Sequence, residues 1–135
     1  MSISYKRRAF SAGLFVLATL GMESPVRSEI TDYEFQLLQS EVKRSEHAFV
    51  AVRLIHKPTG HVVPEAVIFT HRLDMAPDAM PTMKGRLEAL PSTEPGIYPL
   101  KADLAMEGNW RLSLAAKLQG EAGTVQARLI FKAVE

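Results

Sequence analysis

Three methionines lie within nine residues of one another, in the segment Asp74-Met75-Ala76-Pro77-Asp78-Ala79-Met80-Pro81-Thr82-Met83. The prolines predict a loop, and loops normally run over the surface, where large apolar side chains need an explanation. A thioether sulfur is soft and uncharged, and soft ligands select monovalent copper over harder ions. The cluster therefore predicts a Cu(I) site. The competing interpretation is a loop that plugs the open end of a fold, since methionine is an adaptable core filler.

Two flanking segments offer further ligands. His71 lies four residues before Met75, so both side chains share one face of a strand. Met106 precedes the turn Glu107-Gly108-Asn109, which leads into Trp110. An indole face stabilises a nearby cation, and the alternative role for Trp110 is that of a core anchor. The alternative for His71 is a core histidine whose hydrogen bonds are satisfied. The predicted metal ligands are Met75, Met80, Met83, Met106 and His71.

Other chemistry finds little support in this sequence. His56 and His61 flank a turn at Lys57-Pro58-Thr59-Gly60 and would make at most a weak divalent-metal site. There is no cysteine, no Gly-x-Ser-x-Gly elbow, no His-Glu-x-x-His and no phosphate-binding glycine loop. Asp74 and Asp78 are the only close acidic couple, and we expect them to solvate the loop. We therefore expect no enzyme, and no cofactor other than Cu(I).

The elements that must position these residues are predicted to be strands. Apolar and polar residues alternate with period two between turn residues, which is typical of a sandwich or barrel. The third expected strand places Val67, Phe69, His71 and Leu73 on one face, and only 41–46 suggests a single helical turn. About seven strands over this length favour an all-β, immunoglobulin-like β-sandwich. The expected strands are 32–38, 47–56, 66–74, 85–90, 97–106, 110–118 and 125–131.

The first 28 residues are typical of a signal peptide. Lys6, Arg7 and Arg8 precede an apolar run over 9–22, and we expect cleavage before Glu29. The run is too short for a comfortable transmembrane helix, although an uncleaved anchor is the alternative. Cleavage would leave one periplasmic domain, 29–135, with no membrane span.

Loss of the leader changes the charge. The whole chain has 16 Lys and Arg against 15 Asp and Glu, and the leader holds four of the former and one of the latter, which leaves 12 against 14. With a formal charge of −2, we expect no basic patch for nucleic acid.

The run from Arg72 to Met80, followed by Gly96-Ile97-Tyr98 and then by Met106-Glu107-Gly108-Asn109-Trp110, resembles the FixH/YtkA-like family of exported bacterial domains. In that family a Met-rich loop precedes a G-x-Y strand and an M-x-G-x-W hairpin, and short members are labelled auxin-binding or heavy-metal efflux proteins. The resemblance implies an immunoglobulin-like sandwich with a role in copper or heavy-metal handling. It also implies an efflux-system adaptor or an oxidase-assembly protein as partner.

Two functions from different classes follow. The first is a periplasmic accessory protein that holds copper or a heavy metal and passes it on without catalysing a reaction. The second is a non-catalytic interaction module that uses the Met-rich segment 75–83 as an apolar contact loop, because adaptable methionine surfaces suit that task as well. Binding of a small indole-carboxylate finds less support, since only Arg72 lies near the loop.

Overall fold

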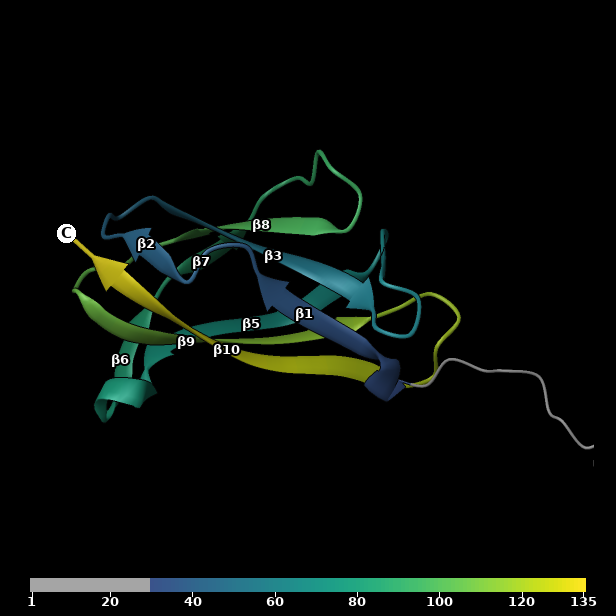
Figure 1. The fold of residues 1–135 in the computed structure, drawn as a ribbon. Helices are drawn as coiled ribbons and strands as arrows, with labels where there is room; N and C mark the ends of the chain where they lie inside the picture. Colours follow the sequence, from purple (N-terminus) through teal and green to yellow (C-terminus); the bar gives the residue numbers. More distant parts are fainter. Residues whose placement is uncertain (1–29) are drawn as a thin grey trace, which may run out of the picture.

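A computed structural model of the chain describes residues 30–135, and the predicted signal peptide lies outside these residues. Two sheets face each other across a common interior (Figure 1). The first sheet holds β1 (Tyr33–Leu37), β3 (Ala48–His56), β8 (Ile97–Ala102) and β7 (Leu87–Ala89) in that order, with β4 (His61–Val62) beside the end of β3. The second sheet runs β2 (Glu41–Lys43), β10 (Thr124–Val134), β9 (Gly108–Lys117), β5 (Val67–Met75), β6 (Met80–Gly85).

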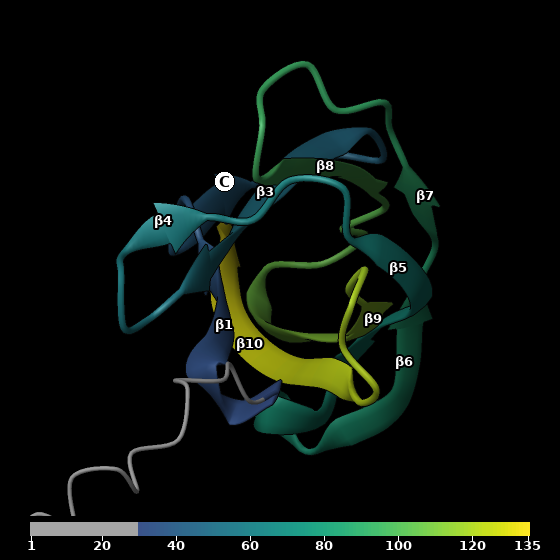
Figure 2. The ribbon, with the colours of Figure 1, turned by 90° about the vertical axis from the view of Figure 1, so that its right-hand side faces the viewer.

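Two 3-10 turns complete the described structure, η2 (Ile30–Asp32) before β1 and η3 (Ala76–Asp78) between β5 and β6. Figure 2, which views the strands end-on, shows the two layers enclosing the interior. Within residues 30–135, no helix has the length and apolar character needed to cross a membrane.

The core forms because each sheet has one apolar face that must be buried against the other. On β9 the inward residues Trp110, Leu112, Leu114 and Ala116 are buried and alternate with half-buried Arg111, Ser113 and Ala115. Opposite them, β3 contributes buried Val50, Val52 and Leu54. The expectation of an all-β, immunoglobulin-like sandwich is confirmed. The described strands exceed the expected seven because β2 and β4 have only three and two residues, too few for a period to show, and because β6 lies in the proline-containing segment predicted as a loop.

The helical turn predicted for 41–46 is wrong. Glu41–Lys43 is strand β2, which pairs in parallel with the end of β10. The pairing sets Val42 opposite Ala133, and both side chains are buried. Burial of one β-branched side chain against a strand from the far end of the chain outweighs the weak local preference for a helical turn.

The inward face predicted for the third strand is also wrong in its first half. Val67 is 63% exposed and Phe69 54% exposed. Ile68 and Thr70 of β5 pair with two consecutive residues of β9, Ala116 and Ala115. Phe69 is therefore the extra residue of a β-bulge. A bulge reverses the alternation of faces, and Ile68 therefore packs against the core before it, as Leu73 does after it.

The predicted loop from Met75 to Met83 contains regular structure. Only the 3-10 turn η3 and Ala79 separate β5 from β6, and Met75 pairs directly with Met80 across them. Pro81 has no backbone N–H to donate, but β6 is an edge strand, and one row of its backbone groups has no partner strand. Pro81 is therefore compatible with the pairing of β6.

Candidate functional site

The turn η3 is bound to the start of β9 through one side chain. The Asn109 backbone N–H donates to Asp78 Oδ2 at 2.8 Å, and Asn109 Nδ2 donates to Asp78 Oδ1 at 3.0 Å. These two bonds, the backbone one first, lower the pKa of Asp78 more than its partial burial raises it. The turn η3, which Met75 and Met80 flank, and the hairpin before Trp110 are therefore held at the same end of the sandwich.

Gly108 allows this close approach. Its φ is 134°, a conformation that side-chain-bearing residues rarely adopt. A Cβ built there would lie 2.5 Å from Asp78 Oδ2 and 2.7 Å from Met75 Cε. The methyl group of Met75 is thus packed against the hairpin backbone, and the sequence predicts only a turn at this glycine, without its tertiary role.

Asp74 anchors the other side of the turn. Its Oδ1 accepts the Ala76 N–H at 2.9 Å, and its Oδ2 lies 3.1 Å from Arg111 Nη2 and 3.2 Å from Arg72 Nε. Burial raises the pKa of Asp74, but the Ala76 N–H and the two guanidinium groups together lower it below its usual value. The sequence predicts Asp74 and Asp78 as loop-solvating residues, whereas the structure uses both as anchors of the turn.

The four methionines differ in exposure. Met75 is 0% exposed and belongs to the core. Met80 and Met83 are half-buried and pack against that core from β6. Met106 lies outside the strands and is 37% exposed. The sulfur-bearing side chains therefore divide into one sealed residue and three with some access to solvent.

Trp110 lies at the centre of this end. Its indole Nε1 donates to the Met106 carbonyl at 3.1 Å, and the side chain is 0% exposed. A Cβ on Gly85 would lie 3.4 Å from Trp110 Cζ3, so β6 runs close against the indole ring. Met83 precedes Gly85 by two residues and shares its face of the strand. The core-anchor role weighed for Trp110 is what the structure shows.

The predicted ligand His71 is not brought to this end. It lies on β5 opposite Leu114, in the middle of the second sheet. His71 and Met75 are four residues apart on an extended strand, so their Cα atoms lie about 13 Å apart. This distance is too long for both side chains to bind one ion. His56 and His61 do pair across β3 and β4, where His56 Nδ1 lies 2.9 Å from Thr59 Oγ1. In the part of the chain that the structure describes, no three His, Asp or Glu side chains group as metal ligands.

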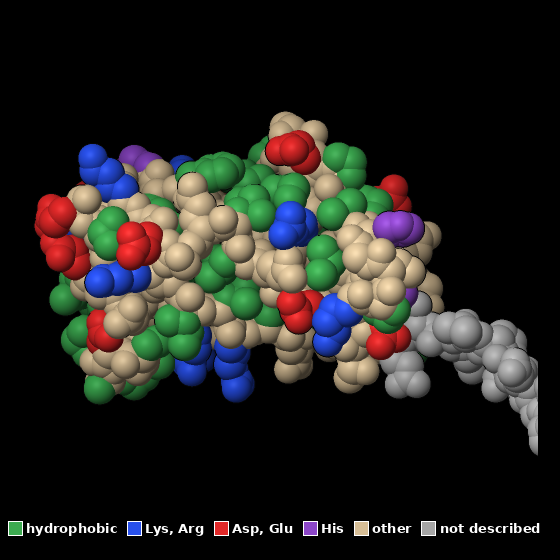
Figure 3. All heavy atoms as spheres, in the orientation of Figure 1, with side chains coloured by type: hydrophobic (Ala, Val, Ile, Leu, Met, Phe, Trp, Pro, Cys, Tyr) green, Lys and Arg blue, Asp and Glu red, His purple; other side chains and the backbone are tan. Residues whose placement is uncertain are grey.

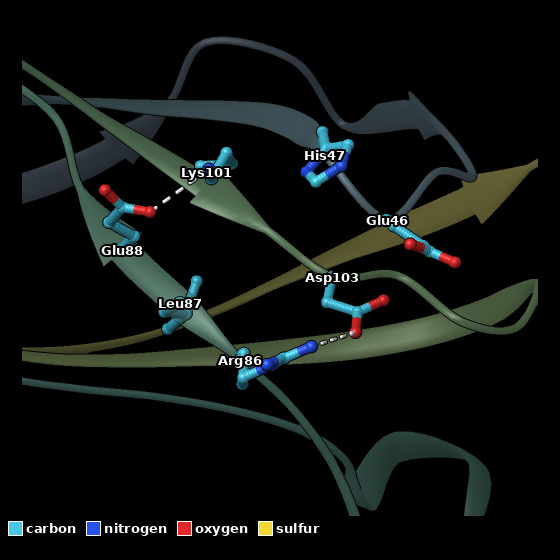
Figure 4. Close-up of a pocket in the computed structure, with 7 residues that line it drawn as sticks. All are labelled: Glu46, His47, Arg86, Leu87, Glu88, Lys101 and Asp103. Carbon is cyan, nitrogen blue, oxygen red and sulfur yellow. Dashed lines mark ion pairs between the residues drawn. The ribbon is translucent and has the colours of Figure 1, made fainter.

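A separate hollow of about 430 Å³ opens on the first sheet beside β7 and β8 (Figure 4). Two ion pairs cross its walls, Lys101 to Glu88 at 3.1 Å and Arg86 to Asp103 at 3.8 Å. Their charges neutralise each other. The sequence carries no signal for this hollow because its lining comes from three distant segments: Glu46, His47, Arg86, Leu87, Glu88, Lys101 and Asp103.

Comparison with known proteins places the sequence in a family. The profile described as YtkA-like matches residues 27–115. The match carries no FixH, auxin-binding or efflux label. No curated protein matches the chain.

Two solved structures have a similar fold. The ZirS C-terminal domain is 15% identical, with 100% of this chain and 87% of that chain covered and a TM-score of 0.46. The Lin-41 filamin domain is 16% identical, with 76% and 95% covered and a TM-score of 0.42. Both likenesses are weak, and the fold described above rests on the chain's own strand pairing. Since the family profile spans well over half of the sequence, this chain belongs to the YtkA-like family.

Proposed function

We propose that this chain is a periplasmic, non-catalytic accessory domain that holds Cu(I) through the thioethers of Met80, Met83 and Met106. The observation that carries the proposal is the pair of hydrogen bonds between Asp78 and Asn109, which ties the two methionine-bearing segments together.

The donor chemistry supports a soft monovalent ion. Thioethers are neutral, so they do not repay the desolvation of a doubly charged hard ion, but they bind Cu(I) well. Exchange of weak neutral ligands lets the ion pass to a partner such as an efflux-system adaptor or an oxidase-assembly protein. Met75 has a different task, because its side chain is sealed in the core.

The test is competition for Cu(I) against a chromogenic chelator, with a chain that begins at Glu29. We expect the triple variant Met80→Leu, Met83→Leu, Met106→Leu to compete no better than buffer. The matched control Met75→Leu removes a thioether of the same size from the core and should compete like the parent. Met-to-Leu changes conserve volume and usually cost less than about 1.5 kcal/mol of stability.

Tryptophan fluorescence gives a second readout, because the chain has a single Trp and its indole bonds to the Met106 carbonyl. Cu(I) should change the emission of the parent and of Met75→Leu but not that of the triple variant. If the triple variant competes as well as the parent, the thioether site is wrong. The segment 75–83 then becomes the apolar contact surface of an interaction module.

A further inference from the structure

The outer face of the second sheet concentrates positive charge from five strands. Cross-strand partners point to the same side of a sheet, and the register sets Asp74 beside both Lys84 and Arg111. The same rule places the neighbouring outward positions of β2, β5, β9 and β10 on this side. The cations of this surface, called the basic face below, are Lys43, Arg72, Lys84, Arg111, Lys117, Arg128 and Lys132.

Acidic residues are almost excluded from the basic face. Among the strand positions only Glu41 and Asp74 share it, and Asp74 is 0% exposed between Arg72 and Arg111. Glu107, which precedes β9, lies near Lys132 at the margin of the face. Seven cations against two acids leave a charge of +5. The remaining described residues hold five Lys or Arg against eleven Asp or Glu, a charge of −6. The near-neutral net charge of the described chain therefore divides between a cationic face and an acidic remainder.

Exposed apolar side chains lie among these cations. Ile130 is 56% exposed and pairs with Arg111, and Val67 is 63% exposed and pairs with Lys117. The bulge residue Phe69 is 54% exposed on the same strand as Val67. In Figure 3 Lys and Arg side chains project from the lower margin, beneath the strands β9 and β10 of Figure 1.

The combination of a broad cationic surface with scattered apolar side chains fits an anionic bilayer. Each Lys or Arg close to acidic headgroups strengthens binding about fivefold, and the long side chains reach the headgroups without a shaped pocket. Exposed apolar groups among them enter the boundary between headgroups and acyl chains. An acidic protein would satisfy the cations but would leave Ile130, Val67 and Phe69 without a defined pocket.

We propose that the basic face docks this domain on a membrane surface rich in anionic phospholipid. The proposal does not depend on copper binding. The contact between Asp78 and Asn109 lies at the end of the strands, so the methionine segments stay open to a partner while the flat side of the second sheet rests on the lipid.

Vesicle sedimentation tests the proposal, with the chain that begins at Glu29, because both sheets and the described core lie in residues 30–135. We expect it to sediment with vesicles of equal parts phosphatidylcholine and phosphatidylglycerol but not with phosphatidylcholine alone. Salt at about 1 M, where the screening length falls to about 3 Å, should release it.

A charge-matched pair of variants locates the surface. Lys84→Glu, Lys117→Glu and Arg128→Glu together should reduce partitioning onto the anionic vesicles by roughly 100-fold or more. The control Lys57→Glu, Arg86→Glu and Lys101→Glu changes the net charge equally, on the side of the first sheet, and should bind within a few-fold of the parent. Circular dichroism melting curves establish that both variants remain folded.

Two results would overturn the proposal. Equal losses in the two triple variants would show that net charge, and not this face, controls binding. Failure to sediment with anionic vesicles, together with binding of the parent to a polyglutamate peptide, would assign the face to an acidic protein partner instead.

Discussion

Asp74 is a carboxylate with no exposed surface, next to last on strand β5 and two residues before the turn η3. Its three partners come from the turn, from its own strand and from β9. Of these partners, Arg72 and Ala76 are each two residues from Asp74 in the sequence. The alternation of residues along a strand cannot indicate that Arg111 lies opposite Asp74. The sequence thus shows only a polar residue beside a loop. The pairing of β5 with β9 places Arg111 within bonding distance of Asp74, so that Asp74 fixes the turn to the second sheet.

The acid dependence of stability should report on Asp74. Its folded pKa is lowered, so its stabilisation is fully present above the unfolded pKa of about 3.9 and is lost as pH falls through the lower folded value. We expect Asp74→Asn to reduce the free energy of unfolding at neutral pH by about 1–3 kcal/mol. The variant should also lose stability less steeply than the parent below about pH 4.

Urea unfolding over a pH series measures both effects. Glu94→Gln, which neutralises an exposed acid, is the control and should follow the parent. A variant curve parallel to that of the parent throughout the acid range would contradict the role assigned to Asp74.

At the scale of the element, strand β5 has large apolar side chains both in solvent and in the core. Before the bulge the large side chains of Val67 and Phe69 face solvent, whereas Leu73 is 1% exposed in the core. Period-two counting cannot locate a bulge, because the extra residue is defined only by the partner strand. The same counting is reliable on β9, where no bulge interrupts the pairing with β10.

A matched pair of substitutions on β5 tests this assignment. Leu73→Ala should lower the free energy of unfolding by about 2–5 kcal/mol, because it opens a cavity in the core. Phe69→Thr should change it by no more than about 0.5 kcal/mol, as for most surface positions. Thermal unfolding of both variants decides the matter, and a large loss for Phe69→Thr would place that ring inside the sandwich.

At the scale of the whole molecule, the complete described core lies in residues 30–135. The described strands of both sheets all lie within these residues, so a chain that begins at Glu29 retains them. Expression of the full chain in a bacterial host, followed by intact-mass measurement of the periplasmic fraction, should give a product that begins at Glu29 or within a few residues of it. A cell-envelope product of full-length mass would instead establish an uncleaved anchor.

Local pattern by itself determined the fold class, the inward residues of β3, β9 and β10, and the choice of methionine as the residue type most able to bind a soft ion. It could do so because the period of a strand and the softness of a thioether are properties of short segments. Only the tertiary structure decided that β2 pairs in parallel with β10, that Asp78 binds Asn109, that His71 lies away from Met75, and that seven cations share one face. Each of these depends on which distant strand becomes a neighbour, and pairing partners are chosen by burial of the whole core.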